Sequence, residues 1–331
     1  MAAPTTIEIF SSFIENLALV TDQLRNGVVD RVADGFDLDN FWQRINVAVK
    51  CLSKECTKLV LVFSEPPVPT PTDCQTMIST IEKTTLALIS IYYTLPKIHG
   101  ECLLKSVTDS VLLIIEGVSS LAECIKTQGF SGTQDCTLMS TGCLWEACEK
   151  FESLPKTNRE VVLKQVKEHL ELIKDAINEL EEAMNSEDGA AVEDDGGGGE
   201  DDLVIWSESD RSFVTSCIGL MKCTRGLLKK LTTVLRTIDC DSMLVIHDLD
   251  DLNERLKCLS PVTDDLAMSL YPPINHTVAL IQMNENAEML NNTIEFVKQG
   301  HLSSESDAAW IELLLNAVQH NLQKAKTLNG Q

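Results

Sequence analysis

Between residues 163 and 184, apolar side chains recur every three or four positions, and this spacing constrains the fold more than any other feature of the chain. Because an α-helix turns once in about 3.6 residues, such spacing gathers the apolar side chains on one side of a helix. Thr157 and Glu160 precede the pattern at capping-box spacing, which predicts where the helix begins. The repeat holds for three heptads and consists of Leu163, Val166, Leu170, Ile173, Ile177, Leu180 and Met184.

The same spacing recurs along most of the chain, and no strand-like alternation or hairpin turn accompanies it. We therefore predict an all-α fold. Thr72 and Gln75 are expected to cap the third helix, and Ser260-Pro261 is expected to separate one helix from a short following piece. The predicted helices cover about 5–24, 37–63, 72–95, 104–125, 138–154, 157–184, 209–236, 241–259, 274–297 and 304–328.

After Met184 the helical pattern ends in an acidic, glycine-rich run. Residues 187–202 contain eight acidic side chains, four consecutive glycines and no base, a composition typical of a disordered linker. The run divides the chain into an N-terminal helical bundle over 1–185, a linker over 186–202 and a C-terminal bundle over 203–331. Short connections between long helices predict up-and-down packing in both bundles. The first helix could complete either one.

Net charge and cysteine placement bound the function. The net charge of −23 would repel a phosphate backbone or an anionic membrane surface, so we expect neither direct nucleic-acid binding nor membrane binding. Residues 1–17 lack the basic start of a signal peptide. The twelve cysteines fall at helix-core positions such as Cys56, Cys124 and Cys217, which predicts buried free thiols in a reducing compartment. An intracellular protein is therefore expected.

Catalytic patterns are absent from the sequence. None of the six histidines follows a glutamate by three positions, as a di-iron bundle requires, and no zinc spacing or phosphate-binding loop is present. We therefore predict a protein that is not an enzyme and holds no cofactor or metal.

Two interpretations of the heptad repeat remain open. It could take up a partner helix, or it could be one core stripe of a bundle. The second interpretation is favoured because other helices of the chain show the same spacing. In the second case partners would contact the polar side of the helix. The acidic run could likewise be a tether alone, a contact for a basic groove, or a switch set by phosphorylation of Ser186, Ser207 or Ser209. The predicted partner-binding residues are Lys164, Lys167, Glu168, Glu171, Lys174, Asp175, Glu179, Glu193, Asp194, Asp195, Glu200, Asp201 and Asp202.

Six short strings, in order across most of the chain, are similar to motifs of the cyclin-D1-binding protein family, also called cyclin-D-interacting helix-loop-helix proteins. None of them marks an active site. The strings are Phe41–Asn46, Ile91–Lys97, Leu144–Cys148, Trp206–Glu208, Asp264–Pro273 and Asp307–Ile311.

This resemblance implies bundles like those of vinculin and alpha-catenin, and a non-enzymatic negative regulator of cell-cycle progression. Such a protein binds D-type cyclin, hinders a cyclin-dependent kinase from phosphorylating retinoblastoma protein, pairs with helix-loop-helix transcription factors, and occurs in cytoplasm and nucleus. The family's cyclin-contacting part corresponds to Leu144–Asp202, although the linker here is shorter and richer in glycine. No basic region precedes a helix pair, so we expect partner sequestration without DNA contact. The alternative is a cytoskeletal or scaffold adaptor of the vinculin type.

Overall fold

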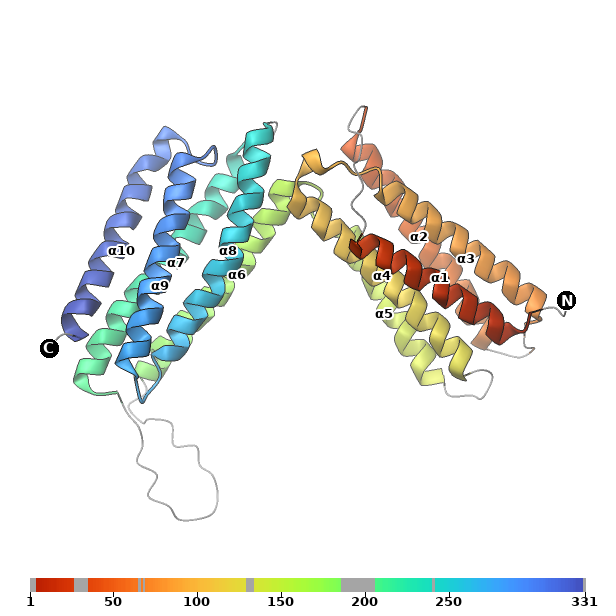
Figure 1. Ribbon diagram of the computed structural model, residues 1–331, viewed down its shortest axis with the longest axis horizontal. Coiled ribbons are helices and arrows are strands. Elements are labelled where there is room, and N and C mark those ends of the chain that lie inside the picture. The colour runs from red at the N-terminus through yellow and green to blue at the C-terminus, as the bar shows by residue number, and fades with distance from the viewer. Residues whose placement is uncertain are drawn as a thin grey trace, which may run out of the picture. The chain divides into compact units, whose positions relative to one another are not determined.

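The computed structural model describes residues 4–26, 35–64, 67, 69–128, 134–185, 206–239 and 242–329. These residues form ten α-helices and two short 3₁₀ helices, with no strand among them, so the prediction of an all-α fold is confirmed. The chain divides into two compact units, an N-terminal unit of Met1–Thr157 and a C-terminal unit of Asn158–Gln331. In each unit the helices lie side by side (Figure 1).

The N-terminal unit is a ring of five helices. α1 packs against α3 and α4, α3 packs against α2, and α5 packs against both α2 and α4. The first helix, whose place the sequence left open, therefore belongs to this unit. The helices are α1 (Thr6–Asn26), α2 (Leu38–Ser64), α3 (Pro71–Tyr92), α4 (Glu101–Gln128) and α5 (Gln134–Glu152).

Large aromatic side chains fill the interior of this ring. Phe10 and Phe13 of α1 are almost fully buried, and the rings of Phe10 and Phe63 meet edge to face at 5.6 Å. Trp42 is buried next to Phe151, and its indole N–H donates to the carbonyl of Lys156 at 2.9 Å. That bond holds the segment after α5 against α2, where the N-terminal unit ends.

The C-terminal unit is a second ring of five helices. α6 packs against α7 and α8, α10 packs against α7 and α9, and α9 packs against α8. Within the ring α7 also contacts α9. The helices are α6 (Asn158–Asn185), α7 (Glu208–Thr237), α8 (Met243–Ser269), α9 (His276–Gln299) and α10 (Ala308–Asn329).

The domain boundary lies earlier than predicted. We assigned residues 157–185 to the first bundle, but α6 packs on α7 and α8, and the chain divides between Thr157 and Asn158. The heptad spacing of α6 reveals which side is buried but not which helices bury it. The predicted cyclin-contacting segment Leu144–Asp202 is consequently split, with its α5 part in one unit and α6 in the other. The predicted linker 186–202 lies outside the described residues.

Two local predictions are also corrected. α3 is capped by Thr70 and Asp73, with Pro71 at the first helical position, where its missing N–H costs nothing. α8 does not end before Pro261 but runs on to Ser269. A proline inside a helix costs about 3 kcal/mol. Side chains on both sides of Pro261 are buried against α6 and α9, and this packing offsets the cost.

Most described cysteines are free, as predicted. Cys56 and Cys217 are buried, and burial raises the pKa of each thiol to about 12. Cys124 was predicted to be a free thiol, but it takes part in a disulfide. No helix in the described part of the chain has the continuous apolar stretch that a membrane span requires.

Candidate functional site

The polar side of α6 is the predicted partner surface, and the structure leaves it uncovered. Of the heptad residues, Val166, Ile173, Ile177 and Leu180 are buried in the C-terminal unit, where α6 packs on α7 and α8. The repeat is therefore a core stripe and not a free groove for a partner helix. The seven predicted residues on the opposite side of α6 are all exposed, namely Lys164, Lys167, Glu168, Glu171, Lys174, Asp175 and Glu179.

Two contacts show how α6 lies beside α8. Near the start of both helices, Asn158 Nδ2 donates to Asp250 Oδ1 at 2.9 Å. Farther along, His169 lies close enough to Asp264 for each group to affect the pKa of the other. Asn158 precedes His169 in α6, and their partners Asp250 and Asp264 follow in the same order in α8. The two helices therefore run parallel, and the His169 side of α6 faces α8.

The exposed side of α6 consists of two stripes that run along the helix, one toward α8 and one away from it. Glu168, Leu172, Asp175 and Glu179 follow one another at spacings of four, three and four, next to His169 on the edge that faces α8. The remaining exposed charges lie around the helix, on the far side from α8. These are Lys164, Lys167, Glu171 and Lys174.

α8 continues this acidic edge and adds apolar side chains to it. Asp264 and Met268 are one helical turn apart on the α6 side, and Tyr271 follows at the end of the helix, close enough to Glu179 for that charge to affect it. Met268 is 72% exposed and Leu172 55%. We call this set the α6–α8 surface and define it as Glu168, Leu172, Asp175, Glu179, Asp264, Met268 and Tyr271.

His169, next to the α6–α8 surface, adds no positive charge to its carboxylates at neutral pH. Burial lowers the pKa of His169, so its ring is uncharged at neutral pH. Partial burial and the neighbouring charge of Asp265 raise the pKa of Asp264. Partial burial, followed by the charge of Glu179, raises the pKa of Tyr271. The surface therefore has the chemistry to receive a basic patch that carries apolar side chains.

The lysine side of α6 is largely paired within its own helix. Lys174 contacts Glu171 at 2.9 Å, which raises the pKa of Lys174, and Lys164 lies 3.9 Å from Glu168. Lys167 makes no ion pair within the described part of the chain. Exposed pairs of this kind contribute little to stability. The exposed lysines of α6 thus lie on its outer side, whereas Glu168, Asp175 and Glu179 lie toward α8.

Both ends of the acidic run are attached at the same end of the C-terminal unit. The guanidinium of Arg211 donates to the carbonyl of Met184, near the end of α6. The indole N–H of Trp206, where description resumes, donates to Leu270 O at 2.9 Å, and its ring lies 6.3 Å from that of Tyr271. The described residues that flank the run thus lie at one end of the C-terminal unit, and Trp206 lies beside Tyr271 of the α6–α8 surface. Its predicted binding residues Glu193, Asp194, Asp195, Glu200, Asp201 and Asp202 lie outside the described residues.

The serines predicted as phosphorylation sites differ in their surroundings. Ser207 caps α7: its hydroxyl donates to Asp210 Oδ2 at 2.7 Å and accepts the backbone N–H of that residue. Ser209 is exposed within the first turn of α7, and Ser186 lies outside the described residues. A phosphate on Ser207 would displace the cap and meet the Asp210 carboxylate, whereas Ser209 remains open to modification.

Sequence reasoning found the carboxylates of α6 but missed the apolar half of the surface. Leu172 was passed over because it lies off the heptad repeat, although an apolar residue among charges on a polar side is itself a signal. Met268 and Tyr271 belong to the string Asp264–Pro273 that carried the family resemblance, but only the parallel packing of α6 and α8 brings that string to α6. No group of metal-ligating side chains is present among the described residues.

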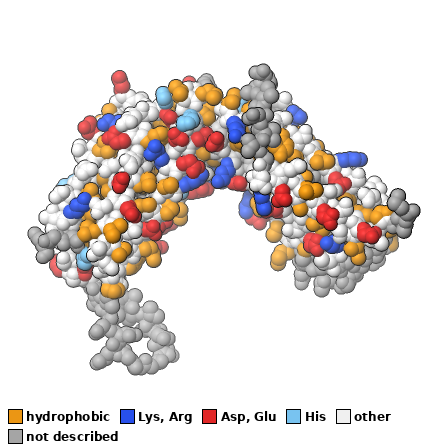
Figure 2. Space-filling view, in the orientation of Figure 1, with side chains coloured by type: hydrophobic (Ala, Val, Ile, Leu, Met, Phe, Trp, Pro, Cys, Tyr) orange, Lys and Arg blue, Asp and Glu red, His pale blue; other side chains and the backbone are white. Residues whose placement is uncertain are grey.

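Acidic and hydrophobic side chains intermix on the visible faces of both units (Figure 2), so neither kind alone marks a site. The α6–α8 surface is distinguished by exposed apolar side chains, carboxylates and the docked Trp206 in one place.

Comparison with known proteins matches most of the chain to one protein family. Residues 44–186 match the N-terminal family model described as "Grap2 and cyclin-D-interacting", and residues 188–299 match its C-terminal counterpart. The chain is 36% identical to the cyclin-D1-binding protein 1 homologue of Danio rerio, over 93% of this chain and 91% of that protein. It is 35% identical to the Xenopus laevis homologue, over 97% and 98%, and 29% identical to cyclin-D1-binding protein 1 of Homo sapiens, over 99% and 94%.

Proposed function

The chain belongs to the Grap2 and cyclin-D-interacting family, and from this premise we propose that it binds a D-type cyclin without catalysing a reaction. The observation that carries the proposal is the α6–α8 surface. Leu172 and Met268 are more than half exposed on a packed bundle, where burial of either would be favourable. Exposed apolar side chains bordered by carboxylates are typical of a binding surface.

The two kinds of side chain on this surface would act in different ways. Carboxylates attract a basic patch over a distance and raise the association rate, an effect that salt weakens. Leu172 and Met268 would then each contribute up to about 1.5–3 kcal/mol when fully covered by the partner. A stable complex buries about 800 Å² on each partner, so we propose that the acidic run adds to the contact.

Occupying the cyclin is sufficient for the proposed regulatory effect. A bound cyclin surface is closed to other proteins, which would hinder a cyclin-dependent kinase from phosphorylating retinoblastoma protein and so restrain cell-cycle progression. We further propose that the same protein sequesters helix-loop-helix transcription factors, and that it acts in both cytoplasm and nucleus. Both proposals rest on the family resemblance.

Binding of a purified D-type cyclin to the full chain tests the proposal. The Leu172→Ala, Met268→Ala double variant should bind at least about tenfold more weakly, because each truncation removes apolar area from the contact. The Ile281→Ala, Leu313→Ala variant is the matched control, since it truncates equally exposed apolar residues on α9 and α10.

A chain lacking residues 187–202 tests the contribution of the acidic run separately. We expect weaker binding and a smaller dependence on salt concentration, because fewer charges attract the partner. Equal loss in the α6–α8 and control variants would contradict the assigned surface. Failure of the unmodified chain to bind would contradict the cyclin proposal, and co-sedimentation with actin filaments would then favour the scaffold alternative.

A further inference from the structure

The N-terminal unit carries a groove that its helices leave open. The groove lies between α2 and α3 and has a volume of about 500 Å³. Apolar side chains account for much of its lining, and Val47 among them is 61% exposed. We call it the α2–α3 groove, lined by Asn40, Gln43, Arg44, Val47, Ala48, Cys51, Thr84, Ala87 and Ile91.

Helical spacing and small side chains create the groove. On α2, Asn40, Arg44, Val47 and Cys51 follow one another at spacings of four, three and four, and thus form one stripe. Across from them α3 presents residues 84, 87 and 91, of which Ala87 is too small to fill the space. The α2 stripe is about 16 Å long at 1.5 Å per residue, which matches three turns of a third helix laid along the pair.

Arg44 is the one charged residue in the lining, in a chain whose net charge is −23. It forms no ion pair within the described residues. In the surrounding string, Phe41, Trp42 and Ile45 are buried in the core, so packing explains their presence. Packing does not explain the exposed Arg44, whose guanidinium is available to a carboxylate from outside.

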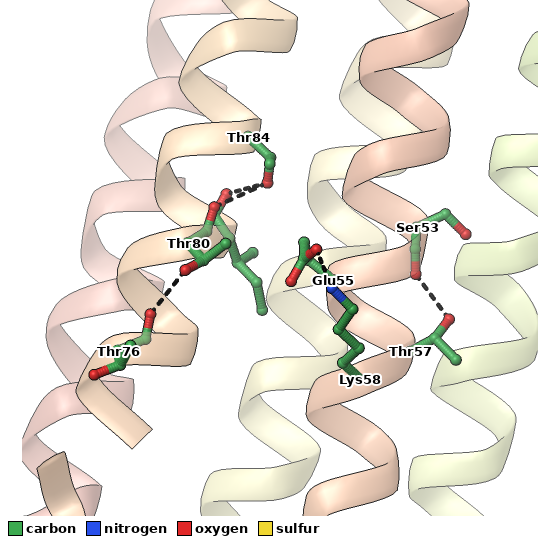
Figure 3. A network of polar contacts seen from close by, with 8 residues as sticks. Ser53, Glu55, Thr57, Lys58, Thr76, Thr80 and Thr84 are labelled. Carbon is green, nitrogen blue, oxygen red and sulfur yellow. Dashed lines mark hydrogen bonds and ion pairs between the residues drawn. The ribbon is translucent and has the colours of Figure 1, made fainter. Parts of the chain in front are cut away.

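At the edge of the groove, from Thr84 toward the other end of the helix pair, polar groups satisfy one another (Figure 3). Thr80 and Thr84 on α3 each donate a hydroxyl proton to a carbonyl one turn earlier, at 3.0 and 3.1 Å. On α2, Glu55 and Lys58 pair at 2.6 Å and add no net charge. The threonine hydroxyls are therefore already bonded, and the Glu55–Lys58 pair adds no net charge at this end of the helix pair.

We propose that the α2–α3 groove binds an amphipathic helix of a partner protein, with small apolar residues on the buried side and a carboxylate that pairs with Arg44. Side chains of the bound helix would occupy the space above Ala87 and beside Val47, in the helix-in-groove mode. A small molecule fits less well, because the exposed walls would leave much of its surface in water. The inference does not rest on cyclin binding, which is assigned to the other unit.

A displayed library of 18-residue peptides tests this proposal with the full chain as bait. The peptides carry Ala, Leu or Ile at positions i, i+3, i+4 and i+7, with random residues elsewhere. Selection runs against the unmodified chain and counter-selection against Ala87→Arg, which fills the groove from an exposed helix position and should leave the fold intact, as circular dichroism would verify. Affinities of enriched peptides follow from fluorescence anisotropy.

We expect the enriched peptides to share an Asp or Glu at one register and to bind Arg44→Glu roughly tenfold more weakly. Changing that acid to Lys in the peptide should restore binding to Arg44→Glu, a rescue that a merely structural Arg44 would not show. Lys105→Glu is the control, since it makes the same charge change on an exposed position of α4, a helix that contributes no residue to the groove.

Three results would overturn the proposal. The first is a selection that enriches no peptide over the counter-selected pool. The second is equal binding of the peptides to Arg44→Glu and the unmodified chain. The third is self-association in sedimentation velocity that Ala87→Arg abolishes, which would make a second copy of this chain the occupant. Peptide binding should persist when the α6–α8 surface is altered, so this proposal and the cyclin proposal can fail separately.

Discussion

Two polar side chains lie completely buried between α8 and α9, and their removal has an asymmetric cost that can be predicted. Asn286 Nδ2 donates to Thr263 Oγ1 at 2.8 Å, and that hydroxyl donates onward to Leu259 O at 2.8 Å. Both side chains have no exposed surface. Asn286 Oδ1 has no hydrogen-bond partner within the described residues, so the amide depends on Thr263 alone.

Thr263→Val keeps the shape of the side chain but removes the acceptor. The Asn286 amide protons would then be buried and unpaired, which costs about 1–3 kcal/mol. Asn286→Leu, in contrast, leaves the Thr263 hydroxyl bonded to Leu259 O and removes an oxygen that had no partner, so it should change stability by less than about 1 kcal/mol. The double variant should lie close to the unmodified protein, because neither unpaired group remains.

Amide hydrogen exchange of α8 and α9 in the full chain provides the assay, since it reports the C-terminal unit without interference from the other. Thr263→Val should speed exchange of the most protected amides about 5- to 150-fold, which corresponds to the same 1–3 kcal/mol. If Thr263→Val proves no more harmful than Asn286→Leu, or if the double variant is as unstable as the sum of both, the reasoning is refuted.

Three further changes test other parts of the structure. Gly219→Ala would place Cβ against the side-chain amide of Asn321, where α7 meets α10, and should lower the stability of the C-terminal unit by about 1–3 kcal/mol in urea unfolding. Asn321→Ala should recover much of that loss. Trp206→Phe removes the hydrogen bond to Leu270 O and should speed amide exchange at the start of α7 by about fivefold, with the rest of the unit unchanged. Burial lowers the pKa of His169 below its ordinary value of about 6.5, so the unfolded chain takes up a proton first as the pH falls; stability should decline from pH 7.5 to 5.5, and less steeply in His169→Gln. Unchanged exchange at α7 or identical pH profiles would contradict the last two expectations.

Local sequence patterns predicted the helices well because each helix carries its own signal. Thr5 and Glu8, for example, stand at capping-box spacing in the sequence, and Glu8 Oε2 accepts the Thr5 N–H at 2.7 Å. Errors arose where packing outweighs a local preference. Pro261 reads as a helix stop, yet α8 passes through it because the helix is buried on both sides of that residue.

Placement of α6 could not be predicted from its own residues. Its apolar stripe would fit either bundle, and the choice is fixed by contacts to residues distant in sequence, such as Asn158 with Asp250 and Arg159 with Ile238. The candidate site was predictable to the same extent. Exposure of Asp175 and Glu179 followed from helical periodicity, whereas their proximity to α8 depends on the parallel packing of α6 and α8.

The central claim is that this protein acts by presenting the α6–α8 surface to a D-type cyclin. Calorimetric titration of a purified D-type cyclin into the full chain tests it most directly, using Asp175→Lys with Glu179→Lys on the surface and Glu285→Lys with Glu288→Lys on α9 as an equal charge change elsewhere. The account predicts binding by the unmodified chain and the α9 control alike, and at least about tenfold weaker binding by the surface variant. Equal binding by all three proteins, or none by the unmodified chain, would contradict it.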